Sequence, residues 1–321
     1  MKLSEKMNYK HYNKFYDHLD FMKYRNVFFI FSAMLIVLGI ISLLVFKLNL
    51  GIDFSSGTRV DITSNSTHRL TVTEVDKAFR DFGYHPERPV LSGAKNNVVT
   101  VRLNQELSRE QISNLKSNIA DRFHVEQPTI STVSPQVGRD LAKNGLLSLI
   151  IASAFIIIYV WIRFEFLQGL TAVLALIHDA FFIVTVFSLF HIEVNILFIS
   201  AVLTIIGYSI NDTIVTFDRV RENIKMSRKR LTTLKEIGDV VNLSIRETLT
   251  RSLNTVLVVL LPVVFLLFFG SESIKTFTIA LLAGLLCGVY SSICIACPLW
   301  AVLKVHYLAA RKRKRTVRAQ S

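Results

Sequence analysis

Asp212 is the residue whose position in this sequence most strongly suggests chemistry. It lies within the apolar run 195–217, where hydrocarbon surroundings favour leucine or valine. A carboxylate inside a membrane segment is energetically costly, so Asp212 is a candidate functional residue. Hydroxyl residues recur with it at four-residue spacing on one helix face, namely Thr204, Tyr208 and Thr216. Such hydroxyls can hold water and pass protons, and the alternative is that they are polar contacts between helices.

Arg251 is the candidate charge partner of Asp212. The apolar run 256–269 is too short to cross a membrane alone, so its span must begin near Arg251. Asp212 precedes the boundary at Asp218 by six residues, which places it roughly 9 Å deep on the same side. A buried Asp and a buried Arg at matched depth can pair, which lowers the cost of burying both. The alternative for Arg251 is a side chain that reaches lipid phosphates.

His178 and Asp179 are a second ionisable pair inside an apolar run. They lie about 14 positions beyond Glu165, which is roughly 21 Å into the membrane at 1.5 Å per residue. A solvated turn is excluded because apolar residues flank the pair on both sides. The pair could serve proton transfer, and a structural polar contact between helices is the alternative.

The composition is that of a membrane protein with several spans. Of 321 residues, 51% are hydrophobic and 19% are charged, which is too apolar for a soluble domain of this length. The net charge of +13 could indicate nucleic-acid binding. Much of the basic charge lies in short segments beside apolar runs, however, which is a signal of membrane topology. We therefore expect no nucleic-acid partner.

The cysteines do not indicate a disulfide framework, a metal site or a cofactor. They are odd in number and lie in one apolar run, as Cys287, Cys294 and Cys297. The last two have a zinc-like spacing, but there is no second pair and no nearby histidine. We therefore expect these cysteines to be small residues buried in the membrane. We also expect the protein to bind no metal and no cofactor, and we do not expect it to be an enzyme.

Six apolar runs are long enough to cross a hydrocarbon core of about 30 Å. They are residues 27–46, 142–162, 167–190, 195–217, 251–269 and 276–303. Lys and Arg gather in the N-terminal segment 1–26, the loop 218–250 and the tail 304–321, which carry six, eight and seven such residues. Because basic flanks mark the cytoplasmic side, both termini are predicted to be cytoplasmic. The basic tail would also suit anionic lipid.

The segment 47–141 is then on the outer side, and its length is enough for a small domain. Its apolar spacing predicts strands at 58–63, 89–91, 97–103 and 128–133 and helices at 71–82 and 108–123. This βαββαβ order indicates a ferredoxin-like sandwich. The predicted fold is an α-helical polytopic membrane protein of six transmembrane helices, with a small α+β ferredoxin-like domain between the first two. We interpret that domain as a binding or interaction domain.

Sequence motifs give the chain a family resemblance. Residues 207–213, Gly-Tyr-Ser-Ile-Asn-Asp-Thr, and 217–223, Phe-Asp-Arg-Val-Arg-Glu-Asn, resemble the fourth-helix signature of the SecD/SecF family of protein-export proteins. Residues 51–57 are similar to the family's Gly-x-Asp-Phe-x-Gly-Gly motif, with Ser56 in place of the first paired glycine. The family markers in this sequence are Gly51, Asp53, Phe54, Gly57, Gly207, Asn211, Asp218 and Arg219. We interpret Asp218 and Arg219 as boundary anchors.

The resemblance implies half of a transporter of the RND superfamily, with the other half supplied by SecD. It implies a subunit of the bacterial cytoplasmic membrane that uses the proton motive force to promote late stages of protein translocation. The implied partners are SecD, the SecY/SecE/SecG channel, YajC, YidC and the exported unfolded polypeptide. Asp212 would be the protonatable carboxylate and Arg251 its charge partner, and the candidate relay also includes Asp179, His178 and Thr216.

Two other functions are open at this point. A small-molecule exporter could use the same relay, as other RND proteins do, but the outer domain is small and has no evident ligand-pocket signature. A structural assembly subunit without a proton role predicts that Asp212 and Arg251 tolerate neutral substitution.

Overall fold

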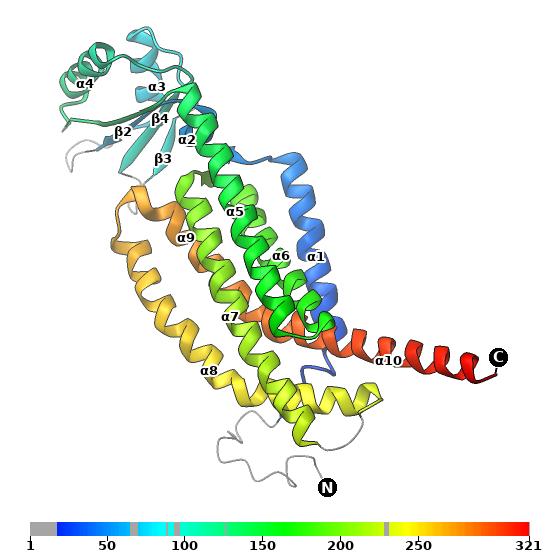
Figure 1. The fold of residues 1–321 in the computed structure, drawn as a ribbon. Coiled ribbons are helices and arrows are strands. Elements are labelled where there is room, and N and C mark those ends of the chain that lie inside the picture. The colour runs from blue at the N-terminus through cyan, green and yellow to red at the C-terminus, as the bar shows by residue number, and fades with distance from the viewer. Residues whose placement is uncertain are drawn as a thin grey trace.

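A bundle of long helices carries a small α/β domain at one end, and the C-terminal helix projects from the other (Figure 1). We call these the domain end and the distal end. The computed structural model describes residues 18–64, 70–87, 89–92, 97–125, 127–227 and 231–320, with side chains except at 92, 272–273 and 312–320. Most of the predicted basic segment 1–26 lies outside the described residues.

The six predicted spans are confirmed as helices that are long and apolar enough to cross a membrane. They are α1 (Arg25–Val45), α5 (Pro135–Arg163), α6 (Phe166–Leu189), α7 (Ile196–Met226), α8 (Leu234–Phe269) and a composite of α9 (Glu272–Tyr290), the π-helix η3 (Ser291–Ala296) and α10 (Cys297–Gln320). Helix α7 packs most extensively on α9, whereas α1 lies at the edge of the bundle against α6. Ile205 and Ser209 of α7 lie directly against Gly284 and Gly288 of α9.

Two helices continue beyond the predicted apolar runs at the distal end. Helix α7 extends past Asp218, and α8 begins far upstream of Arg251. A capping box starts α8, because the Thr233 side chain accepts from the main-chain amide of Glu236 and the Glu236 side chain accepts from that of Thr233. Ile237 is buried one turn later. Capping and packing therefore extend these helices where hydropathy alone predicted loops.

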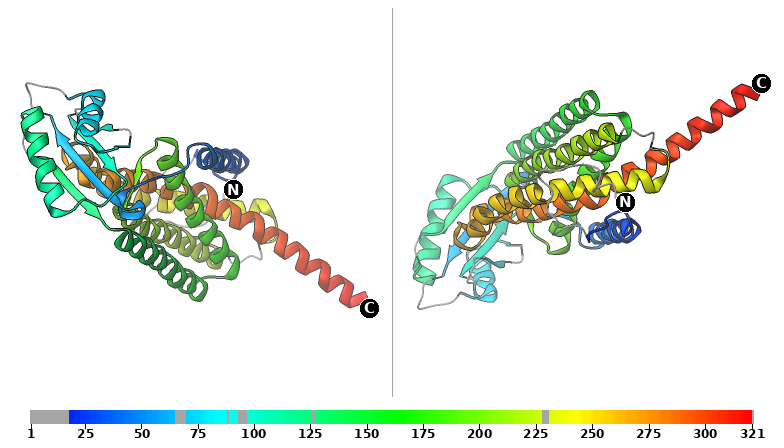
Figure 2. Two further views of the ribbon diagram at one scale, coloured as in Figure 1. Left: turned by 90° about the horizontal axis from the view of Figure 1, so that it is seen from above. Right: turned by 90° about the horizontal axis from the view of Figure 1, so that it is seen from below.

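The basic tail 304–321 continues as helix α10, which leaves the bundle sideways (Figure 2). At the first residue of the tail, the Lys304 ammonium lies 2.5 Å from a Glu165 carboxylate oxygen. The side chains of 312–320 lie outside the described part of the chain, so contact of the tail with anionic lipid stays a prediction.

The domain between α1 and α5 has the predicted βαββαβ order. Its elements are β2 (Gly57–Thr63), α3 (Val72–Asp81), β3 (Val90–Ser92), β4 (Val98–Leu103), α4 (Arg109–Phe123) and β5 (Thr129–Val133). The strands form an antiparallel sheet in the order β3-β4-β2-β5, which confirms the ferredoxin-like sandwich. Val60 and Val101 of the sheet share a buried core with Phe79 of α3 and Leu115 of α4.

A short parallel strand pair joins this domain to the membrane bundle, and the sequence did not predict it. Strand β1 (Asn49–Leu50) follows α1 and pairs with β6 (Glu193–Val194), which lies in the turn between α6 and α7. The single-turn helix α2 (Ile52–Ser55) then leads into β2. The entry to the domain is thereby placed beside the first residues of α7.

Candidate functional site

Asp212 lies on α7 with only one of its two carboxylate oxygens hydrogen-bonded. Ser252 of α8 donates its hydroxyl to Asp212 Oδ1 at 2.5 Å. Oδ2 is buried and has no hydrogen-bond partner in the described part of the chain. Because buried polar atoms are normally paired, the unfilled acceptor Oδ2 is the atom at which a proton could be taken up.

A cavity of about 400 Å³ lies beside Asp212 between α7, α8 and α9. Its lining includes Asn211, Asp212, Asn254 and Gly288. Liquid water takes about 30 Å³ per molecule, so the cavity has room for several waters, and its polar groups can bind them. The arrangement can therefore deliver a proton to Asp212 through water.

Arg251 does not form the predicted direct ion pair with Asp212. Among the described residues, no carboxylate oxygen lies within 4.0 Å of its guanidinium nitrogens. The next residue along α8, Ser252, takes that place and is buried, whereas Arg251 is exposed. Neighbouring helix residues point about 100° apart, which the depth estimate from the sequence did not resolve. Arg251 still acts on Asp212 through its charge at longer range.

Polar side chains form an exposed face on α7 and α8 close to Asp212. Tyr208 and Asn211 project from α7, and Arg251 and Asn254 project from α8. We call these four residues the exposed polar face. Gly207 is also exposed beside it, with no other atom within 4 Å of the place where a side chain would begin. Polar and charged groups at this depth are costly against hydrocarbon, so in a membrane this face requires a protein or water cover.

The predicted hydroxyl stripe of α7 is not a continuous chain of hydrogen bonds. Thr204 donates to the main-chain carbonyl of Ser200, and Thr216 donates to that of Asp212. Such bonds to the preceding turn are common for Thr in helices. Thr216 thus contacts Asp212 through its main chain, and its part in a relay stays a prediction.

Asp179 is a residue of α6, and its carboxylate is surrounded by hydrogen-bond donors from α7 and from the composite sixth helix. Ser209 of α7 and Ser291 of η3 donate to Oδ2 at 2.6 and 2.7 Å. The Cys287 thiol of α9 donates to Oδ1 at 3.2 Å. We call Asp179, Ser209, Cys287 and Ser291 the Asp179 cluster. Because Asp179 is only 1% exposed, the cluster is a polar cross-link in the centre of the bundle.

His178 borders this cluster. Its Nδ1 lies 3.3 Å from Asp179 Oδ1, and its buried Nε2 has no hydrogen-bond partner among the described residues. Donor atoms of His178, Asp179 and Cys287 lie within 4.8 Å of one another, close enough to share a metal ion. Cysteine binds metals as the thiolate, however, and here the thiol donates to the carboxylate. The contacts therefore favour polar packing over metal coordination.

The two membrane carboxylates lie in separate side-chain hydrogen-bond networks that meet α7 at Ser209 and at Asp212. Within the described ranges, no side-chain hydrogen bond links Asp179 to Asp212, although the cavity is bordered by both Ser209 and Asp212. Sequence reasoning did not select Ser209, Ser252, Ser291 or Cys287. A search for small polar residues in apolar runs at the depth of each acid would have found them.

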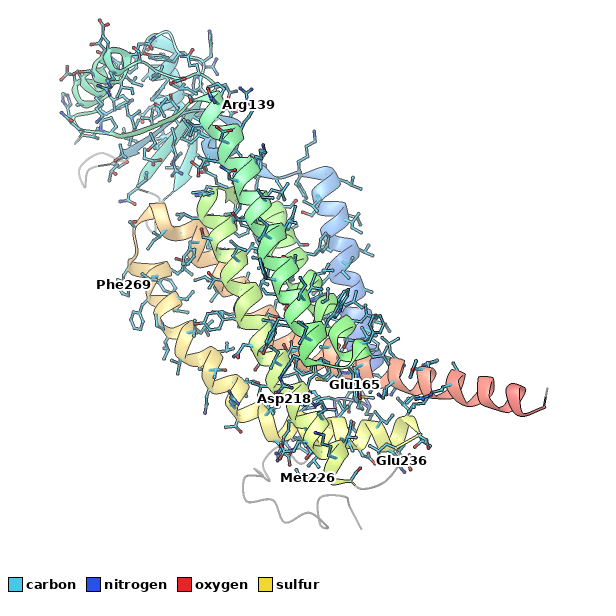
Figure 3. All side chains as sticks on the ribbon, viewed as in Figure 1. Arg139, Glu165, Asp218, Met226, Glu236 and Phe269 are labelled. Atoms are coloured by element: carbon cyan, nitrogen blue, oxygen red, sulfur yellow. The ribbon has the colours of Figure 1, made fainter. Side chains whose placement is uncertain are left out.

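Asp218 and Arg219 take part in ion pairs at the distal end. Asp218 pairs with Arg163 at 2.7 Å, and Arg219 pairs with Glu222 and Glu247, both at 2.6 Å. Figure 3 places Asp218 at this end of the molecule. These contacts tie α7 to its neighbours and fit the interpretation as anchors.

The motif at 51–57 lies where the outer domain meets the bundle. Asp53 Oδ2 accepts from the main-chain amide of Ile196, the first residue of α7, at 3.0 Å. Phe54 packs against the core of the bundle. Gly57 has φ +120°, and a side chain there would meet the carbonyl of Leu103, so the position requires glycine.

Ser56, which replaces a family glycine, has φ +62°. Positive φ is unfavourable for residues other than glycine, so the substitution holds the turn in a strained conformation. Its main-chain amide donates to the carbonyl of Ile52 at 2.9 Å, which closes the turn after α2.

Comparison with known proteins agrees with these motifs. Residues 111–306 match the family described as "Protein export membrane protein SecD/SecF, C-terminal", and residues 41–67 match the "SecD/SecF GG Motif". The first match covers more than half of the chain. The second covers the end of α1, the junction with the outer domain and strand β2.

Relatives from three organisms give the extent of the similarity. SecDF of Bacillus subtilis is 51% identical over 285 residues, which are 89% of this chain and 38% of that protein. SecF of Alicyclobacillus acidocaldarius is 39% identical, over 88% of this chain and 91% of that protein. A crystal structure of the translocon-associated membrane protein SecDF from Thermus thermophilus has a TM-score of 0.80 and 30% identity, over 89% of this chain and 38% of that one.

The chain thus spans less than half of its SecDF relatives but nearly the full length of a SecF relative. The matched regions include membrane helices α5 to α9, strands β2 and β5 of the outer domain and the glycine motif. The chain belongs to the SecD/SecF family of protein-export membrane proteins.

Proposed function

We propose that this chain is the SecF-type half of a proton-driven complex that promotes late stages of protein translocation. The observation that carries the proposal is Asp212, whose unpaired oxygen lies beside a hydratable cavity. A group with these surroundings can alternate between a charged and a neutral form as protons arrive. The proposed activity is transport, and we propose that it needs no cofactor.

The exposed polar face supports a second membrane half as partner. Arg251 and Asn211 are too polar to face lipid, and Arg251 has no carboxylate within ion-pair distance in the described part of the chain. We propose that SecD covers this face and presents an acidic or carbonyl group to Arg251. The B. subtilis relative named SecDF supports this choice, since it extends well beyond the part matched here.

The further partners belong to the same proposal. They are the SecY/SecE/SecG channel, YajC, YidC and the exported unfolded polypeptide. The family's description as protein-export proteins supports a channel and a polypeptide substrate. We propose that the domain end faces outward from the bacterial cytoplasmic membrane and that both termini are cytoplasmic, because the described residues of the basic segments, 18–26, 218–227, 231–250 and 304–320, lie at the distal end.

In the proposed cycle, a proton reaches Asp212 Oδ2 through the cavity. The neutral carboxyl no longer needs the charge of Arg251, its Oδ1 still accepts from Ser252, and its protonated Oδ2 can now donate a hydrogen bond into the cavity. Helices α7 and α8 then pack differently, which shifts the balance between two arrangements of the complex. Release of the proton on the other side restores the first arrangement.

The test is proton flux and protein export in vesicles that contain this chain, SecD and the channel. We expect Asp212→Asn to reduce both by on the order of tenfold or more, because the group that transfers the proton is lost. The matched control is Asp76→Asn, which removes an exposed ion pair with Arg80 in the outer domain and should leave both rates unchanged. Unchanged flux and export in Asp212→Asn would sink the proposal.

Two rival functions give different results in the same vesicles. A small-molecule exporter would move a fluorescent dye in a proton-dependent way without the channel. A structural subunit would assemble with SecD and support export equally well with Asp212→Asn and Arg251→Gln. The partly unpaired carboxylate beside the cavity favours the proton-driven function over the structural one.

A further inference from the structure

A partly buried ionic junction connects the outer domain to the turn between α6 and α7. Glu193 of β6 accepts from Arg59 of β2 at 3.1 Å and from Arg102 of β4 at 2.6 Å. The Glu193 side chain is 14% exposed, and the two arginine side chains are 20% and 16% exposed. Both arginines lie on the sheet face opposite Val60 and Val101, since successive strand residues alternate between faces. The uncovered face of the sheet is therefore fixed to the bundle.

Each arginine of the junction has a second partner. Arg59 also pairs with Asp61 at 3.0 Å, and Arg102 donates to the side-chain oxygen of Asn49 in β1 at 2.7 Å. Burial opposes the charge of Arg59, but Glu193 and then Asp61 more than offset it and raise the pKa of its guanidinium. Removing one member of such a partly buried group leaves the charge of its partners less well compensated, so we expect the paired residues to hold together.

A second contact reaches α7 itself. The first amides of a helix have no partner within the helix, and here Asp53 accepts from the first of them, that of Ile196. A negative charge at this end also interacts favourably with the helix dipole. Gly51 packs so closely that a side chain there would collide with the carboxylate of Glu193. The motif residues and Glu193 are thus parts of one contact.

We propose that Glu193 and Asp53 form a permanent mechanical joint through which movement of α7 reaches the outer domain. We call Glu193, Asp53, Arg59, Arg102 and the β1–β6 pair the outer joint. Glu193 and Asp53 are positioning residues, because they do not contact the proton-carrying residue and are connected to it only through α7. The inference rests on the proposed function and supplies the route by which a change at Asp212 moves the outer domain. The joint stays closed throughout the cycle, because Glu193, Arg59 and Arg102 are largely withdrawn from solvent and each of the three has two partners.

The first experiment measures the orientation of the domain. Spin labels at Asn118→Cys on α4 and Ser271→Cys before α9 report the distance between domain and bundle, and both sites are exposed while the native thiols are buried. In Glu193→Gln we expect a broader distance distribution and loss of export, with the chain still assembled with SecD. The Asp76→Asn control should keep a narrow distribution. An unchanged distribution together with normal export in Glu193→Gln would overturn the joint.

The second experiment locks the joint covalently. Leu50 and Val194 are register partners in the β1–β6 pair, so Leu50→Cys with Val194→Cys should form a disulfide on oxidation. We expect the locked protein to export normally and the lock to restore export and the narrow distribution to Glu193→Gln. Loss of export on oxidation, reversed by a reductant, would show that the joint must open and would overturn its permanence.

The two proposals can fail separately. Proton flux that survives Asp212→Asn refutes the proton-driven function, whatever Glu193→Gln does. Normal domain orientation and export in Glu193→Gln refute the joint, even where Asp212→Asn abolishes flux. Failure of the lock to rescue Glu193→Gln assigns Glu193 a local stabilising role instead of a mechanical one.

Discussion

Asp179 and Asp212 are two carboxylates in the same membrane bundle with opposite surroundings. Asp179 receives hydroxyl or thiol bonds from Ser209, Cys287 and Ser291 and is 1% exposed. Asp212 receives one side-chain bond, from Ser252, and has an unpaired oxygen beside a cavity. The sequence predicts one relay that contains both, and the difference in their hydrogen bonds supports the proposal that Asp212 carries the proton.

The difference shows that a buried acid in a membrane can be a structural cross-link or a proton carrier. A fully bonded carboxylate holds helices together and would lose those bonds if it changed charge. A partly bonded carboxylate beside water can change charge with little rearrangement. The number of filled acceptor sites therefore separates the two roles better than depth in the membrane does.

The largest expected effect is on stability when each acid is truncated. Asp179→Ala should lower the free energy of unfolding by roughly 3 kcal/mol, because it leaves buried donors from three helices unpaired. Asp212→Ala should lower it by less than about 1 kcal/mol, because one donor is lost and the cavity can hydrate the site. Denaturant unfolding in detergent micelles measures both. Equal losses of unfolding free energy in the two variants would contradict the assignment of different roles to Asp179 and Asp212.

An intermediate effect is expected from the serine that donates to each acid. Ser209→Ala should cost about 1.5 kcal/mol of stability, since the lost bond goes to a fully buried charged acceptor. Ser252→Ala should cost about 0.5 kcal/mol but reduce proton flux more than Ser209→Ala does. Unfolding and flux assays on the same two variants provide the measurement. A larger loss of proton flux in Ser209→Ala than in Ser252→Ala would indicate that Asp179, and not Asp212, carries the proton.

The smallest effect is expected for a matched pair of cysteines. Cys287→Ala and Cys294→Ala remove the same atoms from buried positions, but only Cys287 bonds to Asp179. The first should be less stable than the second by about 0.5 kcal/mol, which is the contribution of a weak thiol donor. Thermal unfolding of the two variants measures the difference. Equal stability of the two variants would show that the Cys287 thiol contributes nothing to the Asp179 cluster.

Much of the fold could be predicted because its signals are local. Apolar runs of spanning length and the alternation within β2 and β4 fixed the membrane helices and the outer domain. The helix predicted at 108–123 is α4, and a capping box of Ser108 and Gln111 starts it. The distal extensions of α7 and α8 were missed because they depend on capping and packing, which hydropathy does not register.

The candidate site was predicted in its residues but only partly in its contacts. Depth along a helix follows from counting, so Asp212 and Arg251 were placed near one another. Angular position depends on how α8 is rotated against α7, and this brought Ser252 to Asp212 in place of Arg251. The β1–β6 pair could not be foreseen either, because two-residue strands far apart in the chain leave no periodic pattern.

Helix α7 runs unbroken from Ile196 to Met226, with Asp212 near its midpoint. At 1.5 Å per residue, its two arms extend about 24 Å and 21 Å from that residue. A tilt of about 5° around Asp212 would therefore displace both ends by about 2 Å in opposite directions. One arm ends at Asp53, and the other passes the ion pair of Arg219 with Glu247. A single rocking motion would thus be felt on both sides of the membrane at once, like the two arms of a lever.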